Sequence, residues 1–365
     1  MLSTKPVSRS YLPDSDHVIL NIMSIVSPLA DSVRPNSTST LSWQAAMRRA
    51  IRDPAELCRL LELPHELVEP AREAAETFGL FVPLEFLRRI ERGNPRDPLL
   101  RQVLPLGEEL AEAPGFTADP VGDLASQTAP GLLHKYQGRA LLVVTGACPV
   151  HCRYCFRRHF PYGEGPRSVQ QFAPALDVIA SDKSIEEVIF SGGDPLTVVD
   201  DRLAELADAI AEMEHIKRLR IHTRMPIMIP QRVTGELLDW LTNTRLSPVV
   251  VVHANHANEI DEAVAASLTQ LADAGDMLLN QSVLLRGVND YAAALIELSK
   301  RLLETRVLPY YLHQLDRVTG ASHFQVSEST GCELIRQMQS RLPGYAVPRY
   351  VREDEGALSK TPLQS

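Results

Sequence analysis

Six short apolar runs between residues 140 and 314 place the strongest constraint on how this chain folds. Amphipathic helical stretches separate the runs, which lie at 140–145, 187–193, 218–223, 248–254, 277–285 and 307–314. Strands that alternate with helices in this way are typical of a parallel sheet with helices packed outside it. Most runs are apolar at consecutive positions, as strands buried on both faces require. The pattern predicts an α/β fold with six parallel strands, either open or closed into a barrel.

The rest of the chain differs in composition. We expect a disordered start, a helical N-terminal domain, a linking segment, the sheet-containing core and a C-terminal tail, at residues 1–40, 41–95, 96–135, 136–345 and 346–365. The start is rich in Ser, Thr and Pro. In the helical part, apolar residues recur at three- and four-residue spacing, and Asp53, Pro54 and Pro83 mark expected helix starts.

Polar residues gather directly after the apolar runs. They are the cysteines after the first run, Ser191–Pro195 after the second, His222 and Arg224 after the third, His253, Asn255 and His256 after the fourth, and Gln314 and Asp316 after the sixth. In parallel α/β folds the carboxyl ends of the strands form one edge, where active sites lie. We therefore expect these side chains to share one site.

Charge and cysteine content exclude several classes of protein. A net charge of −9 argues against a nucleic-acid binder, which needs a basic face. No apolar run approaches the ~20 residues of a membrane-spanning helix, and the interrupted run at 18–26 lacks the basic leader of a signal peptide. Five cysteines in 365 residues are too few for a disulfide scaffold. We expect a cytoplasmic protein with reduced thiols.

Three of those cysteines, Cys148, Cys152 and Cys155, are crowded into the stretch TGACPVHCRYCFRRHF. Structural zinc sites usually present two CxxC pairs. Here no second pair exists, although His151 or His159 offers a fourth zinc ligand. Three thiolates on a four-iron cluster leave one iron open for another ligand, and nearby arginines and histidines favour the thiolate form. The spacing favours an iron–sulfur cluster, with a zinc-binding, non-enzymatic protein as the alternative.

The C-x3-C-x2-C spacing resembles that of the radical S-adenosylmethionine (radical SAM) enzymes. The stretch SGGDP at 191–195 resembles their glycine-rich motif. The resemblance implies a partial (β/α)6 barrel, a [4Fe–4S] cluster on the three cysteines, and S-adenosylmethionine bound by Ser191, Gly192, Gly193 and Asp194. It also implies an electron donor of the flavodoxin or ferredoxin type.

Separated motifs narrow the resemblance to the lysine 2,3-aminomutase family. They are HKYQGRALLVVTGAC at 134–148, LLRGVND at 284–290, PYYLHQLD at 309–316 and SKTP at 359–362. That family adds pyridoxal phosphate, which forms a Schiff base with a lysine. The resemblance implies that Lys360 holds pyridoxal phosphate, Arg139 and Gln281 bind its phosphate, Tyr136 lies against its ring, and His253 lies near the adenosyl group.

Lysine as a substrate presents a carboxylate at one end and an ε-ammonium at the other. The resemblance implies Arg157 for the α-carboxylate, since a guanidinium matches its fork shape. It implies Asp316 and Glu353 for the ε-ammonium, with Glu353 replacing an aspartate of the family. We expect His222, His256 and His313 to be satisfied structural histidines. The implied reaction moves the α-amino group of lysine to the β-carbon.

Within the family, HKYQGRALL, CRYCFRRHFPYGEG and the short end after Lys360 resemble the elongation factor P (R)-β-lysylation branch. This resemblance implies conversion of (S)-α-lysine to (R)-β-lysine, which a lysyl-tRNA-synthetase-like ligase then attaches to elongation factor P. The alternatives are a degradative lysine 2,3-aminomutase or another amino-acid 2,3-aminomutase, and Asp316 argues against glutamate as substrate. We expect no nucleic-acid or membrane partner, and a homo-oligomer is compatible with the resemblance.

Overall fold

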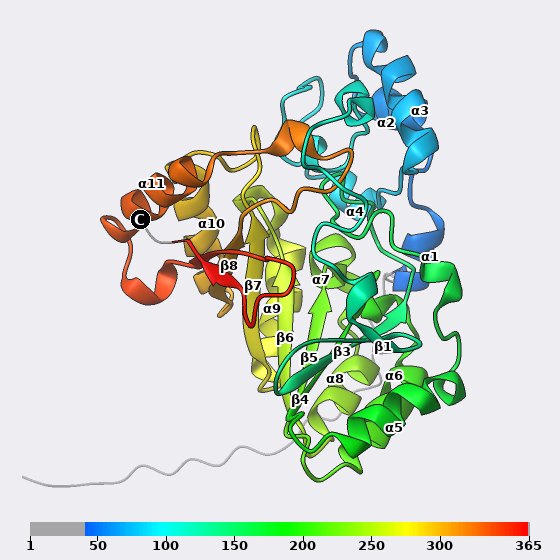
Figure 1. The fold of residues 1–365 in the computed structure, drawn as a ribbon. Helices are drawn as coiled ribbons and strands as arrows, with labels where there is room; N and C mark the ends of the chain where they lie inside the picture. Colours follow the sequence, from blue (N-terminus) through cyan, green and yellow to red (C-terminus); the bar gives the residue numbers. More distant parts are fainter. Residues whose placement is uncertain (1–40, 364–365) are drawn as a thin grey trace, which may run out of the picture. The chain divides into compact units, whose positions relative to one another are not determined.

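The computed structural model describes residues 41–363, which belong to one compact unit (Figure 1). The disorder predicted for residues 1–40 lies outside this range. The α-helices are α1 (Trp43–Arg48), α2 (Pro54–Leu60), α3 (Val68–Thr77), α4 (Leu84–Leu87), α5 (Ala173–Ser181), α6 (Asp200–Ala211), α7 (Met225–Met228), α8 (Gly235–Thr242), α9 (Glu262–Asp273), α10 (Ala292–Glu304) and α11 (Glu328–Gln339). Within the described range, no helix has the length and apolarity needed to cross a bilayer.

One mixed sheet forms the centre of the fold, and its strands are hydrogen-bonded in chain order. They are β1 (Gln127–Ala129), β2 (Leu132–Tyr136), β3 (Arg139–Thr145), β4 (Glu187–Gly192), β5 (Arg218–Thr223), β6 (Ser247–His253), β7 (Met277–Val283), β8 (Leu308–His313), β9 (Arg349–Arg352) and β10 (Thr361–Pro362). The strands β3–β9 are parallel, and the pairs at both ends are antiparallel.

The predicted count of six parallel strands is not confirmed, because the sheet formed by residues 41–363 has ten strands, of which β3–β9 are parallel. The six apolar runs correspond to β3–β8. The other four strands have between two and five residues, too few to produce a recognisable apolar run.

The N-terminal helices share a hydrophobic core with the sheet. Asp53 caps α2 as predicted, because its carboxylate accepts a hydrogen bond from the N–H of Ala55 (3.0 Å). Leu57 of α2, Phe86 of α4 and Val252 of β6 belong to one cluster of buried side chains. Burial against the sheet thus holds these short helices in place.

The carboxyl ends of the parallel strands form one edge of the sheet. Thr145 at the end of β3 pairs with Gly192 at the end of β4. His253 at the end of β6 pairs with Gln281 of β7. The polar residues that follow the apolar runs therefore share one edge, as expected.

The C-terminal segment returns to this edge through a tight connection. The strand β9 pairs in parallel with β8, and β10 turns back to pair with β9 (Figure 1, red). Asp354 fixes the connection, since it accepts hydrogen bonds from Arg352 Nε and Thr361 Oγ1, both at 2.7 Å. Lys360 directly precedes β10 and is thereby positioned at the edge.

The two ends of the sheet also approach each other here. Lys135 lies on β2, near one end, and Glu353 follows β9, near the other. The Nζ of Lys135 lies 3.1 Å from Oε1 of Glu353. Side chains from both ends of the sheet therefore face one space.

Candidate active site

A cavity of about 450 Å³ lies at the carboxyl edge, and every residue to which the family resemblance assigns a role lines it. These residues are Cys148, Cys152, Cys155, Ser191, Gly192, Gly193, Asp194, Tyr136, Arg139, Arg157, His253, Gln281, Asp316, Glu353 and Lys360. Asn255, His256 and Gln314, which were also expected to share the site, do not line this cavity. The structure thus brings together the residues that the resemblance names, although the role of each residue stays a prediction.

The cysteine loop, residues 146–158, is anchored from outside the sheet. Arg153 is fully buried, and its Nε and Nη2 donate to the two carboxylate oxygens of Glu109 at 2.8 and 2.7 Å. Arg158 Nη2 donates to the same carboxylate at 2.8 Å. Arg153 Nη1 also donates to the carbonyl of Phe78 (2.7 Å), just after α3. The segment before the sheet therefore fixes the path of the cysteine loop.

The three thiols suit a multi-iron cluster better than a single metal ion. Within residues 41–363, no three His, Cys, Asp or Glu side chains converge closely enough to hold one ion. The two candidate zinc ligands contact backbone carbonyls instead. His151 Nδ1 lies 2.8 Å from the oxygen of Gly79, and His159 Nε2 lies 3.2 Å from that of Thr319. A four-iron cluster takes each thiolate on a different iron, so its ligands need not converge on one point.

Burial and crowding control the ionisation of the thiols. Burial raises the pKa of Cys155 to about 11, and the neighbouring Cys152 also raises it. Burial, with Cys155 and Asp194 nearby, raises the pKa of Cys148 well above its usual value. Because metals bind the thiolate, the positively charged iron–sulfide core of a cluster would stabilise these buried sulfurs. The donor set therefore fits a [4Fe–4S] cluster.

The SGGDP turn packs against the backbone of the cysteine loop. Gly192 has φ +122°, and a Cβ there would lie 2.4 Å from the carbonyl oxygen of Thr145. A Cβ on Gly193 would lie 2.2 Å from the carbonyl oxygen of Ala147. The N–H groups of Gly193 and Asp194 donate to these two carbonyls at 2.8 and 2.7 Å. Only glycine permits so close an approach of two backbones.

The carboxylate of Asp194 is hydrogen-bonded to neighbouring residues of the protein. It accepts four hydrogen bonds at 2.6–3.0 Å, from Thr223 Oγ1 and from the N–H groups of Leu196, Arg224 and Met225. Burial nevertheless raises its pKa. Asp194 therefore ties the SGGDP turn to the end of β5 and presents no free carboxylate to a ligand.

Five alternating charges line the cavity as a charge row, formed by Arg157, Asp123, Lys135, Glu353 and Lys360. Asp123 lies 2.6 Å from Nε of Arg157 and 2.6 Å from Nζ of Lys135. Glu353 lies 3.1 Å from Lys135 and forms an ion pair with Lys360. The protein's own charges thus pair with Arg157 and Glu353, two of the groups predicted to hold the ends of the substrate.

The two carboxylates predicted for the ε-ammonium differ in ionisation. Burial alone would raise the pKa of Glu353, but Lys360 and Lys135 lower it to about 2. Burial, with Glu353 nearby, raises the pKa of Asp316 to about 7. Within the described range, no side chain forms a hydrogen bond or ion pair with the Asp316 carboxyl group. Asp316 is therefore the carboxyl group that an added cation would stabilise most.

Another part of the cavity is aromatic and basic. The Arg139 guanidinium lies 4.6 Å from the centroid of the Tyr136 ring. Arg220 of β5 lines the cavity and pairs with Glu187, and Gln281 lines it from β7. Arginines and amides of this kind suit a phosphate, and the tyrosine suits an aromatic ring. The donor set therefore fits pyridoxal phosphate.

His222 is not the satisfied structural histidine that the sequence predicts. It lines the cavity, and its Nε2 is buried without a hydrogen-bond partner in the described part of the chain. Burial, then Arg220 and Lys360, lower its pKa well below the usual value, so the ring is neutral. His256 does satisfy the expectation, because its Nδ1 accepts a hydrogen bond from the N–H of Asn258 (3.2 Å). The orphaned Nε2 of His222 suits contact with a bound ligand.

Two further histidines that line the cavity, His253 and His313, are also neutral. Burial, then Arg224, lower the pKa of His253 to about 3. Burial, then Lys360, lower the pKa of His313 to about 3, and its ring packs edge-on against Tyr311 at 5.4 Å. Both rings can therefore donate or accept one hydrogen bond without carrying charge.

Sequence reasoning misses Asp123, Lys135 and Arg220. Asp123 lies in the segment predicted to be a link, and Lys135 looks like a solvated lysine before a strand. In the structure their side chains are only 2% and 15% exposed. Their partners are distant in sequence, so the HKYQGR motif around Lys135 is the only local signal.

Comparison with known proteins finds a radical SAM family model and several L-lysine 2,3-aminomutases that are similar to this chain. Residues 142–256 match the Radical SAM superfamily. An L-lysine 2,3-aminomutase of Escherichia coli (strain K12) is 46% identical over 336 residues, which cover 92% of this chain and 98% of that protein. One of Haemophilus influenzae is 47% identical over 320 residues, covering 88% and 95%. One of Clostridium subterminale is 35% identical over 323 residues, covering 88% and 77%.

Proposed function

Because the chain belongs to the lysine 2,3-aminomutase family of radical SAM enzymes, we propose that it converts (S)-α-lysine to (R)-β-lysine with pyridoxal phosphate as a second cofactor. One observation carries the proposal: the three clustered thiols and Lys360 line the same cavity. A radical and the amino acid it acts on must meet where water is excluded. This shared cavity supports an isomerase that acts on an amino acid.

The residues for both cofactors follow from the cavity wall. Cys148, Cys152 and Cys155 would hold the cluster, and the SGGDP turn at 191–195 would meet S-adenosylmethionine. Lys360 would bind pyridoxal, with the Arg139 region around its phosphate. When bound, the first pair supplies a 5′-deoxyadenosyl radical, and pyridoxal supplies a π-bond across which an amino group can migrate. Strands β3–β8 would form the partial barrel, which the approach of the two sheet ends supports.

Lysine fits the charges at the two ends of the site. Arg157 would bind the α-carboxylate, and Asp316 with Glu353 would bind the ε-ammonium. A half-buried carboxyl group without a side-chain partner among the described residues, such as Asp316, favours a cationic ligand end. A glutamate substrate would place a second carboxylate there and repel Glu353.

We further propose that the β-lysine serves the modification of elongation factor P. The stretches HKYQGRALL and CRYCFRRHFPYGEG, which resemble the elongation factor P (R)-β-lysylation branch, support this proposal. Under this proposal free lysine is the substrate, a flavodoxin or ferredoxin supplies electrons, and the site works in the reducing cytoplasm, where its thiols stay reduced.

The test is anaerobic incubation of the reconstituted protein with lysine, S-adenosylmethionine, pyridoxal phosphate and dithionite. We expect (R)-β-lysine, and none when either organic cofactor is omitted. A protein that holds its cluster but leaves lysine unchanged would overturn the proposal. Adding elongation factor P and its ligase tests the second part, since β-lysine should then be found on the factor.

Metal analysis separates this proposal from the zinc-binding alternative. We expect about four irons and four sulfides per chain after anaerobic reconstitution. One zinc per chain and no sulfide would favour a non-enzymatic protein.

A further inference from the structure

We propose that Arg224 sets the reduction potential of the cluster through a hydrogen bond to Cys152, and that Glu259 positions Arg224 and moderates its charge. This inference rests on the proposed function, because it requires the cluster. It assigns a role to Arg224, which lines the cavity but had no predicted role, and to Glu259, which the sequence analysis did not single out.

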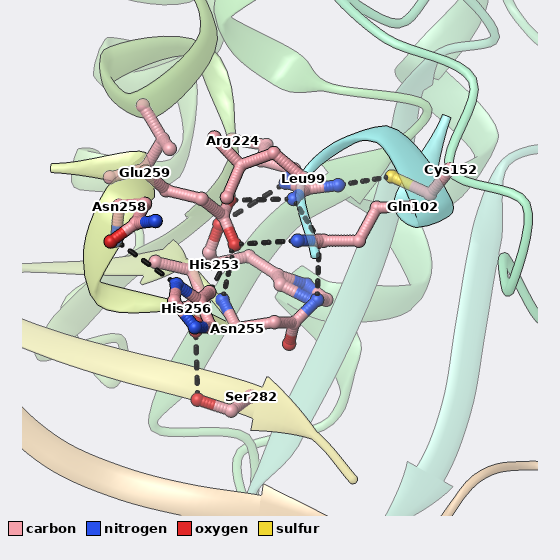
Figure 2. A network of polar contacts seen from close by, with 12 residues as sticks. Leu99, Gln102, Cys152, Arg224, His253, Asn255, His256, Asn258, Glu259 and Ser282 are labelled. Atoms are coloured by element: carbon pink, nitrogen blue, oxygen red, sulfur yellow. Dashed lines mark hydrogen bonds and ion pairs between the residues drawn. The ribbon is translucent and has the colours of Figure 1, made fainter. Parts of the chain in front are cut away.

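Arg224 contacts one cysteine sulfur directly. Its Nη1 lies 2.8 Å from Sγ of Cys152 (Figure 2). In residues 41–363 no other charged side chain donates a hydrogen bond to Cys148, Cys152 or Cys155. Arg224 is buried, with its side chain only 6% exposed. Water therefore screens little of the interaction between its charge and the sulfur.

A buried carboxylate orients the guanidinium from the side away from the thiol. Arg224 Nη2 donates to Glu259 Oε2 (2.7 Å) and to Gln102 Oε1 (2.7 Å) (Figure 2). Arg224 Nε donates to the carbonyl of His253 at 3.3 Å. Nε and Nη2 of Arg224 thus have partners on the side away from the thiol, and Nη1 points at Cys152.

Several hydrogen bonds hold the carboxylate of Glu259 in place. It is fully buried, and its Oε1 accepts hydrogen bonds from Gln102 Nε2 (3.0 Å) and from the N–H groups of Asn255 (2.8 Å) and His256 (3.0 Å). Burial would raise the pKa of Glu259, but Arg224 and the hydrogen bonds lower it, so the carboxylate is charged. In the described part of the chain Glu259 forms no hydrogen bond with a cysteine, so it acts through its contact with Arg224 and through the field of its charge.

These contacts determine the direction of the effect. When a cluster accepts one electron, its negative charge increases, and hydrogen bonds to its sulfurs tune its potential. A cation at Cys152 stabilises the reduced form and raises the potential. The negative charge of Glu259 opposes this effect from a greater distance. Removing Arg224 and removing the charge of Glu259 should therefore shift the potential in opposite directions.

The experiment is a redox titration of the reconstituted protein without S-adenosylmethionine, followed by electron paramagnetic resonance. At the midpoint potential of the wild type, we expect Arg224→Met to lower the ratio of reduced to oxidised cluster about tenfold, which is about 59 mV for one electron. We expect Glu259→Gln to raise the ratio about threefold, the smaller effect of a more distant charge. Arg224→Lys, which keeps the charge but loses the fork, should fall between Arg224→Met and the wild type.

Iron content and thermal melting identify variants that fail to fold or to hold the cluster. If Arg224→Met fails these checks, Arg224→Lys and Glu259→Gln still give opposite signs. Unchanged midpoints in variants with full iron content, or shifts of the same sign, would overturn the inference. A wild type that holds no iron would refute the proposed function instead.

Discussion

The ammonium of Lys360 forms an ion pair with the carboxylate of Glu353, which is predicted to receive the ε-ammonium of the substrate. The protein therefore places one of its own lysine side chains where the substrate is expected to place its ammonium. Glu353 is also held by Lys135, so it stays ionised when Lys360 leaves.

Lys360→Ala should abolish the absorbance of bound pyridoxal, because no Schiff base can form, while the iron content stays unchanged. Ultraviolet–visible spectra and iron analysis of the same sample measure both quantities. Lys183→Ala, at an exposed lysine, serves as the control and should keep both. Pyridoxal that stays covalently attached to the Lys360→Ala variant would show that another lysine holds it.

Lys360→Met should strengthen the binding of L-lysine to the pyridoxal-free protein by roughly tenfold, because the competing ammonium is removed from Glu353. Calorimetry measures the two dissociation constants. L-norleucine, which lacks the ε-ammonium, should bind equally to both proteins. Equal gains for the two ligands would mean that Lys360 affects the site sterically, without electrostatic competition.

The binding of L-lysine should strengthen as the pH rises from 5 to 7, by up to about tenfold per unit, because Asp316 must ionise to pair with an ammonium. Its pKa of about 7 reflects burial beside Glu353, with Lys360, Lys135 and Asp123 also nearby. Calorimetry at several pH values checks this. Asp316→Asn should weaken binding and remove the pH dependence.

The raised pKa of Asp316 also affects the stability of the protein. Stability should fall as the pH rises, whereas the binding of lysine should strengthen. A carboxyl group with a raised native pKa keeps its proton where the unfolded chain, at about 3.9, has lost it, so stability falls as the pH rises from about 4 to 7. Asp316→Asn should flatten this decline of the melting temperature with pH.

Asp276 is a matched control. Burial raises its pKa to about 6, and its carboxylate has no hydrogen-bond partner in the described range. Asp276→Asn should change the melting profile and leave the binding of lysine unchanged.

Gly193→Ala should cost about 1–3 kcal/mol and reduce the retention of iron, because its Cβ would lie 2.2 Å from the carbonyl oxygen of Ala147 in the cysteine loop. Denaturant unfolding and iron analysis measure the two effects. Gly163→Ala is the control, since nothing lies within 4 Å of a Cβ there. Equal stability and iron content in both variants would contradict the close packing of the SGGDP turn.

Glu109→Ala should destabilise the protein by about 3–5 kcal/mol, because Arg153 and Arg158 would be left buried without their counter-charge. Denaturant unfolding measures the loss. The neighbouring Glu108 is exposed, and Glu108→Ala should change stability by no more than about 0.5 kcal/mol. Similar losses in the two variants would argue against the buried ion pairs.

The sequence predicts best what is encoded locally. The strands β3–β8 were visible because each is an apolar run. The strands β9 and β10 have four and two residues and exist only through pairing with their neighbours. The C-x3-C-x2-C spacing likewise predicts a metal site from local sequence, whereas the pairing of Lys135 with Glu353 joins residues 218 positions apart. Such pairs depend on the closure of the whole fold and leave no local pattern.

The position of Lys360 has a consequence for how the protein can be handled. The position of this lysine depends on the pairing of Thr361 and Pro362 with β9. It also depends on the hydrogen bond from the N–H of Leu363 to the carbonyl of Tyr350 (2.9 Å). A carboxypeptidase that trims these last residues would leave the lysine on a frayed end. Under the proposed function, such a shortened protein would keep the three thiols predicted to bind the cluster but would hold pyridoxal less firmly.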